Sequence, residues 1–106
     1  EDVDLNIHLI RNVPATFIIR VQGKSMTDVG IYDGDLLVVD KSLKPKNFST
    51  VVANVHDELV VKNFVEARDE KFLTSGSKKI EDKIIINNES DIFIWGVVTY
   101  VIHSVY

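Results

Sequence analysis

The chain of 106 residues contains no cysteine, a single methionine and only two prolines. Without cysteine it can form neither a disulfide bond nor a thiolate metal site, which is consistent with a cytoplasmic protein. Positive charge is also scarce, because 12 basic residues are outnumbered by 16 acidic ones, for a formal net charge of −4. A domain without a basic run lacks the usual source of non-specific affinity for nucleic acid. We therefore expect a protein partner and no direct binding of nucleic acid.

Long apolar runs are missing as well. Stretches such as Ile92–Val98 are far shorter than the roughly 20 residues of a membrane helix, and no signal-peptide pattern opens the chain. The length and the 45% of hydrophobic residues correspond to one compact domain with a single core. Because the first residue is Glu1 and not Met, we expect residues 1–106 to be a single domain whose upstream segment has been removed by processing or trimming.

Short apolar runs between turn residues predict a mostly β fold. Residues Phe17–Gln22 alternate between two faces with the period of a strand, and the Asp-Gly pair at residues 33–34 is a turn signal before the next run. The other expected strands are Leu36–Val39, Val51–Val55 and Leu59–Phe64, the last two forming a hairpin, with Ile84–Ile86 and Phe93–Ile102 further along the chain.

Helix is expected only as a turn or two, within Leu5–Asn12 and just after Ser25, because a proline or a glycine ends each window. Lys41–Ser49 and Arg68–Lys83 are polar, charged stretches that we interpret as solvated loops. The expected fold is therefore a compact, mostly β domain with one or two short helical turns.

Lys62 is unusual because the residues that share its strand face, Val60 and Phe64, are both apolar. One interpretation is an edge-strand lysine whose stem packs on these residues while its ammonium group reaches water. The other is a desolvated amine. Lowering the pKa of a lysine from about 10.4 to near 7 requires roughly 4 to 5 kcal/mol of differential solvation, which burial can supply. On this second interpretation Lys62 is a neutral amine that can act as a base.

Ser25 follows a β run in the sequence Gly23-Lys24-Ser25-Met26, where Gly23 permits a sharp turn that exposes the hydroxyl group. A serine after a glycine is also common in ordinary turns and at helix N-caps. A nucleophilic serine needs a base within hydrogen-bonding reach, and a neutral lysine can replace the histidine of a catalytic triad. The residues alone leave both possibilities open.

Other kinds of site have weak support. The three histidines are scattered, the acidic residues lie mostly in turns and loops, and Asp33-Gly34-Asp35 lacks the remaining ligands of a calcium loop. Trp95 lies in a β run, where a core position is typical. We expect no metal and no cofactor.

The combination of Gly23–Met26, the segment Gly30–Asp40 and Val60-Val61-Lys62 resembles the active-site signature of the LexA/UmuD family of peptidase S24-like domains. In that family a Gly-x-Ser-Met sequence precedes an Asp-Gly-Asp turn, and a lysine lies on a later strand. The resemblance continues through Gly96–Val98 and covers nearly the whole chain. It implies that Ser25 is the nucleophile, that Lys62 is the general base, and that the backbone N–H groups of Lys24 and Ser25 form the oxyanion hole.

Within the family, Asp4–Asn6 and Pro14–Phe17 are more similar to UmuD, in its processed form, than to LexA. Family members cut their own backbone at an Ala-Gly or Cys-Gly bond, and neither dipeptide occurs in this sequence. The resemblance thus places the scissile bond upstream of Glu1. It also implies an SOS-response protein, encoded by a bacterium, phage or plasmid, whose cleavage is stimulated by the RecA filament on single-stranded DNA. The processed form would be a homodimer that joins a UmuC-like Y-family polymerase, as in DNA polymerase V for translesion synthesis.

Three alternatives remain. The chain could be the self-cleavage and dimerisation domain of a LexA-like or phage-type repressor, whose upstream part would be a DNA-binding helix-turn-helix. It could be an interaction domain in which Ser25 and Lys62 are only structural. A signal-peptidase relative would share the Ser/Lys chemistry but would need a membrane anchor, which this segment does not display.

Overall fold

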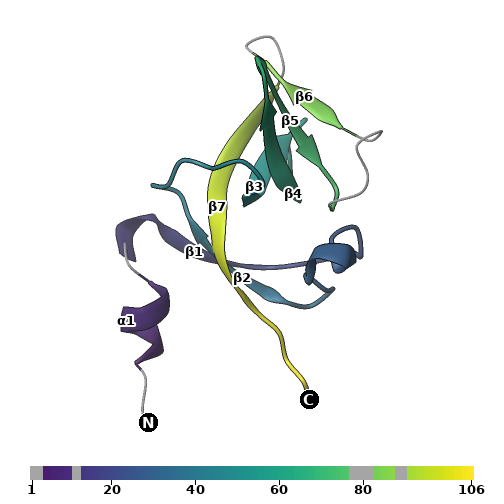
Figure 1. Ribbon diagram of the computed structural model, residues 1–106. Helices are drawn as coiled ribbons and strands as arrows, with labels where there is room; N and C mark the ends of the chain where they lie inside the picture. Colours follow the sequence, from purple (N-terminus) through teal and green to yellow (C-terminus); the bar gives the residue numbers. More distant parts are fainter. Residues whose placement is uncertain (1–3, 11–12, 77–82, 88–90) are drawn as a thin grey trace.

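The computed structural model describes residues 4–10, 13–76, 83–87 and 91–106. In these residues the strands form one antiparallel seven-stranded sheet, with the order β1-β2-β7-β3-β4-β5-β6 (Figure 1). The strands are β1 (Thr16–Arg20), β2 (Leu36–Asp40), β3 (Thr50–Val55), β4 (Glu58–Ala67), β5 (Glu70–Thr74), β6 (Ile84–Ile86) and β7 (Ile92–Ile102). The expectation of a mostly β fold is confirmed.

Helical structure is short, as expected. The described residues contain α1 (Leu5–Leu9) and two 3₁₀ turns, η1 (Val13–Ala15) and η2 (Thr27–Val29). Gly30 ends η2 in the left-handed conformation, with φ of 85°, and donates its N–H to the carbonyl of Thr27. No helix among the described residues has the length and apolar character to cross a membrane.

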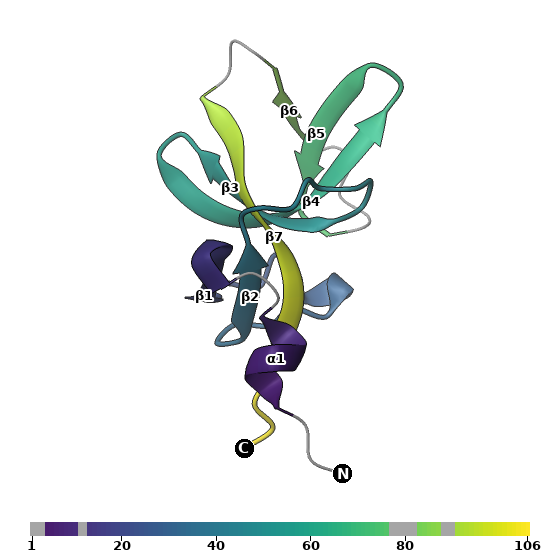
Figure 2. The ribbon, with the colours of Figure 1, turned by 90° about the vertical axis from the view of Figure 1, so that its left-hand side faces the viewer.

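Strand β7 connects the two halves of the sheet. Its first residues pair with β3, from Ile92 opposite Val55 to Val97 opposite Val51, and its last residues pair with β2. Irregularities in both ladders bend the strand along its length. Figures 1 and 2 show the result: β1, β2 and the η2 turn lie at one end of β7, and β3 to β6 lie at the other.

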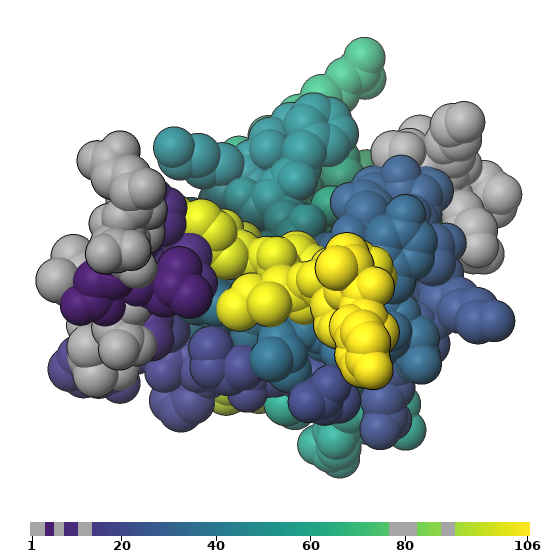
Figure 3. Space-filling model, turned by 90° about the horizontal axis from the view of Figure 1, so that it is seen from below, coloured from purple at the N-terminus to yellow at the C-terminus, as the bar shows by residue number. Residues whose placement is uncertain are grey.

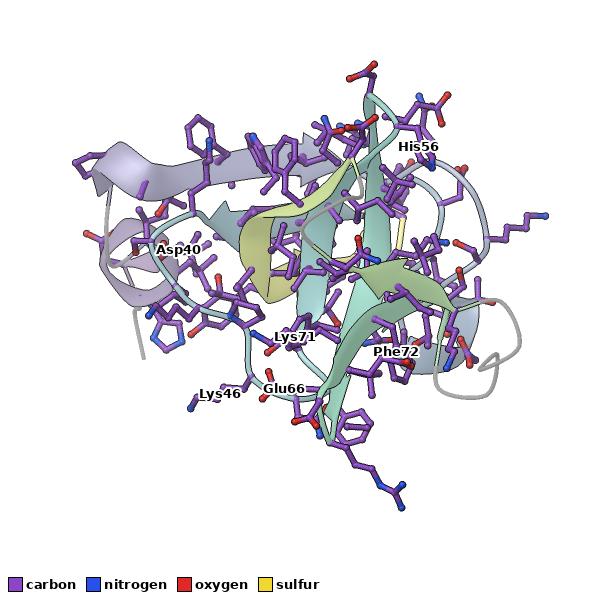
Figure 4. All side chains as sticks on the ribbon, turned by 90° about the horizontal axis from the view of Figure 1, so that it is seen from above. Asp40, Lys46, His56, Glu66, Lys71 and Phe72 are labelled. Atoms are coloured by element: carbon purple, nitrogen blue, oxygen red, sulfur yellow. The ribbon has the colours of Figure 1, made fainter. Side chains whose placement is uncertain are left out.

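One loop prediction is wrong in part. Arg68–Lys83 was expected to be a solvated loop, but residues 70–74 form β5, which pairs with β4. Phe72 and Leu73 are buried there, at 8% and 0% exposure, and they supply the apolar contacts that hold the strand. The strand is hard to recognise in the sequence because charged residues surround its two buried ones. One of them, Lys71, is exposed, and its Nζ lies 3.8 Å from Oε2 of Glu66 on β4 (Figure 4). Residues 77–82 of the predicted loop lie outside the described residues.

The apolar core consists of two clusters. The first packs around the end of β1 and the η2 turn and contains Val21, Met26, Ile31, Leu37, Val39 and Val52, with Trp95 partly buried against it. The second lies under β4 and β5 and contains Val51, Ala53, Phe64, Leu73, Ile92 and Val97. Val52 belongs to one cluster and its two neighbours in β3 to the other, because successive strand residues point to opposite faces.

Candidate active site

The turn that carries Ser25 is anchored by the Asp-Gly-Asp segment. Val21 donates its N–H to the carbonyl of Asp35 at 2.8 Å and accepts the N–H of Gly34 at 2.9 Å. Gly23 has φ of 103°, and its N–H donates to Asp33 Oδ1 at 2.8 Å. The chain can leave the strand sharply at Gly23 because glycine tolerates positive φ.

Met26 holds the other side of this turn. Its side chain is 3% exposed in the first core cluster, and its carbonyl accepts the N–H groups of Val29 and Ile31 at 3.1 and 3.2 Å. Ser25, next to it, is exposed. A buried methionine beside an exposed serine fixes the backbone while leaving the hydroxyl group accessible.

Lys62 lies in the interior of the sheet, since β4 pairs with β3 on one side and β5 on the other. The edge-strand interpretation is therefore wrong. Lys62 is partly buried, and its partner residue on β3, Val51, is fully buried. Its Nζ donates a hydrogen bond of 2.5 Å to Oγ of Ser75, a residue that is 8% exposed.

Ser25 and Lys62 line the same cavity, which has a volume of about 310 Å³. Its wall comes from both halves of the sheet, since β1 and the Ser25 turn form one side and β4 the other. The described residues that line it are Ile19–Gly23, Ser25, Met26, Val52 and Leu59–Lys62. The structure thus brings the two predicted residues to one cavity, with the amine hydrogen-bonded to Ser75 and not to Ser25.

The predicted oxyanion hole lies on the same turn. Lys24 is exposed, in agreement with a side chain that points to solvent. No backbone hydrogen bond among the described residues uses the N–H of Lys24 or of Ser25.

Sequence reasoning missed the residues that support this pair. Nothing in the sequence indicated a role for Ser75, because its position beside Lys62 depends on β5, and that strand was not predicted. Asp33 and Asp35 were predicted only as turn residues, although their carboxylates accept hydrogen bonds from the N–H groups of Gly23 and Tyr32. The Asp-Gly-Asp pattern could have indicated this role, since short acidic side chains commonly bind nearby backbone N–H groups.

Asp35 also binds the segment after β7. It is 2% exposed, and Oδ2 accepts the N–H of Tyr32 at 2.8 Å while Oδ1 lies 2.6 Å from Nδ1 of His103. Figure 3 shows the C-terminal residues, in yellow, against the blue segment that contains this turn. The hydrogen bond from Tyr32 is the main cause that lowers the pKa of Asp35, and His103 adds to it, although burial acts in the opposite direction.

Replacing Asp35 with asparagine is expected to destabilise the protein more at neutral pH than in acid. The pKa of Asp35 in the folded state lies below its ordinary value of 3.8, so folding favours the charged carboxylate. This stabilisation is fully present above the unfolded pKa and is lost as pH falls through the folded pKa. Urea denaturation between pH 7 and pH 3 measures it. The difference in unfolding free energy between wild type and variant should shrink as pH falls, and a constant difference would contradict this account.

Comparison with known proteins gives a consistent result. The family described as Peptidase S24-like matches residues 1–99. The protein MucA of Escherichia coli is 40% identical over 102 residues, which cover 94% of this chain and 69% of MucA. ImpA of Shigella flexneri is 38% identical over 103 residues, 97% of this chain and 69% of ImpA. The LexA repressor of Clostridium acetobutylicum is 33% identical over 82 residues, which cover 77% of this chain and 40% of the repressor.

Proposed function

Because this chain belongs to the peptidase S24-like family, we propose that it is the self-cleavage and dimerisation domain of a UmuD-like SOS-response protein. Ser25 is its nucleophile and Lys62 its general base. The observation that carries the assignment is the shared cavity, in which an exposed serine on a fixed turn lies with a lysine held in the interior of the sheet. Self-cleaving serine peptidase chemistry is the activity of the family.

The proposed reaction uses the side chains of Ser25 and Lys62 and two backbone N–H groups. Ser25 Oγ attacks the carbonyl carbon of the scissile bond while neutral Lys62 Nζ takes the hydroxyl proton. The N–H groups of Lys24 and Ser25 donate hydrogen bonds to the oxyanion. Lys62 then returns the proton to the leaving amine, which gives an acyl-enzyme on Ser25. Water, deprotonated by Lys62, hydrolyses this ester and restores the serine.

The scissile bond is proposed to lie upstream of Glu1, so that residues 1–106 are one domain and the product of cleavage. Its partners would be a second copy in a homodimer, a UmuC-like Y-family DNA polymerase, and the RecA filament on single-stranded DNA that stimulates cleavage. These partners follow from the UmuD-like relatives MucA and ImpA, which match nearly the whole chain. The location would be the bacterial cytoplasm, where such partners act.

A LexA-like repressor domain is the second candidate. This chain is similar to part of the LexA repressor of Clostridium acetobutylicum, but the match covers only 40% of that repressor, whereas the match to MucA covers 69% of MucA. The match to MucA, 40% identical over 94% of this chain, is also higher and longer than the match to this repressor, 33% identical over 77%, which supports the UmuD-like assignment. An interaction domain without activity is the third candidate, and loss of cleavage in the test below would support it.

The test uses a longer chain that carries the natural sequence upstream of Glu1. Incubated with RecA filaments, or alone at alkaline pH, this chain should release a short N-terminal peptide that mass spectrometry can size. The product left behind should sediment as a dimer at micromolar concentration. Release of a helix-turn-helix domain would favour the repressor, and an uncut chain or a monomeric product would contradict the UmuD-like proposal. Because only the neutral amine accepts a proton, the cleavage rate should rise with pH.

A further inference from the structure

Two residues directly after β5, Ser75 and Gly76, contact Lys62 and the turn that carries Ser25. The ladder between β4 and β5 pairs Asn63 with Thr74, so the next residue, Ser75, lies beside Lys62. Both Ser75 and Gly76 are buried, in the bend that follows β5. One carries a hydroxyl group that meets the lysine, and the other meets the turn that carries Ser25.

The contact from Lys62 to Ser75 limits how the amine can rotate. A neutral lysine amine has two N–H donors and one lone pair, and the lone pair must face the hydroxyl of Ser25 for proton transfer. Donation of one N–H to Ser75 Oγ, at 2.5 Å, fixes the direction of the other two positions. Without that acceptor the flexible stem of Lys62 would be free to turn the lone pair elsewhere.

Gly76, the next residue, contacts the turn that carries Ser25. Its N–H donates to Met26 Sδ at 3.2 Å, and Thr74 Oγ1 in turn donates to the carbonyl of Gly76 at 3.1 Å. A Cβ at Gly76 would lie 2.2 Å from Asp28 Oδ1, and the backbone has φ of 75°. The positive φ therefore favours glycine at this position, and any other side chain would also have to displace the carboxylate of Asp28, a residue of η2.

We propose that Ser75 and Gly76 are positioning residues for self-cleavage: Ser75 orients Lys62, and Gly76 docks the turn that carries Ser25. The separation and orientation of nucleophile and base are then set by one dipeptide, not by the two halves of the sheet separately. This inference rests on the proposed Ser25–Lys62 chemistry. Neither residue is among the described residues that line the cavity, so their effect is through the pair alone.

The test measures how fast a fluorophosphonate probe labels Ser25 in this chain, by intact mass spectrometry. Ser75→Ala should slow labelling by about 10²-fold, the effect typical of a misplaced catalytic group. Ser75→Thr, which keeps the hydroxyl acceptor, should restore most of the rate. Gly76→Ala should also slow labelling. Ser42→Ala removes an exposed serine hydroxyl group outside the cavity and should leave the rate unchanged.

A double-variant cycle separates positioning from simple destabilisation. If Ser75 acts through Lys62, adding Ser75→Ala to Lys62→Ala slows labelling no further, because the group that it orients is gone. Additive losses, or a Ser75→Ala variant that labels at the wild-type rate while Lys62→Ala does not, would overturn this inference and leave the catalytic pair intact. A Lys62→Ala variant that labels normally would instead overturn the proposed function itself.

Discussion

Replacing Lys62 with methionine lowers the rate of fluorophosphonate labelling at Ser25 by at least about 10²-fold, the lower range for loss of a general base. Methionine keeps an unbranched stem of similar length, so packing beside the second core cluster is retained while the amine is lost. Lys62→Ala should give the same loss of rate, and Ser25→Ala should remove the label entirely. Labelling by the wild type should also increase with pH, since only a neutral amine can accept the hydroxyl proton.

Lys71→Ala is the matched control for this experiment. Lys71 is an exposed lysine on β5 whose partner is Glu66, and it lies on the same half of the sheet as Lys62. Its removal takes a lysine from the same half of the sheet but takes no group from the cavity. Equal losses in the two variants would show that the effect is one of general electrostatics, and a flat pH profile would contradict the role of Lys62 as base.

Leu37→Ala lowers the free energy of unfolding by about 3 kcal/mol, within the range measured for leucine truncation in protein cores. Leu37 is 0% exposed and packs in the first cluster with Met26 and Ile31, the two buried residues that flank the η2 turn. The cavity left behind therefore lies directly under the Ser25 turn. Labelling of Ser25 should slow as well, because the turn loses part of its support.

Leu43→Ala provides the comparison, because the same atoms are removed from a leucine that is 47% exposed, in the loop after β2. Urea denaturation of the two variants should give a difference of at least about 2 kcal/mol between them. If both variants lost the same small amount of unfolding free energy, the first cluster would not be the core that supports the turn carrying Ser25.

Much of the fold could be predicted from local patterns. The residues of Phe17–Gln22 and the β-branched run after Gly34 did form strands, although β1 is mostly exposed and β2 is buried at nearly every position, so neither strand shows the burial on one face that a period-two pattern predicts. The hairpin of β3 and β4 was also predicted, because its two strands are adjacent in sequence. Each of these signals is contained in a few neighbouring residues.

The sheet order could not be predicted in the same way. Nothing in the sequence of β7 indicates that it lies between β2 and β3, because the pairing of Leu37 with Val101 joins residues far apart in the chain. Ser75 was missed for a related reason. Ser75 contacts Lys62 only because β4 pairs with β5. The strand β5 was not predicted, because charged residues surround Phe72 and Leu73 in the sequence.

Long-range pairing by β7 also has a consequence for timing during protein synthesis. Both Ser25 and Lys62 precede Ile92–Ile102 in the chain, yet the elements that carry them are joined through that strand. Pairing of distant strands must await the later segment, and domains fold as their residues become available. A growing polypeptide therefore cannot complete the sheet that joins these two elements until β7 has been translated, and under the proposed function an unfinished chain would be protected from cutting itself.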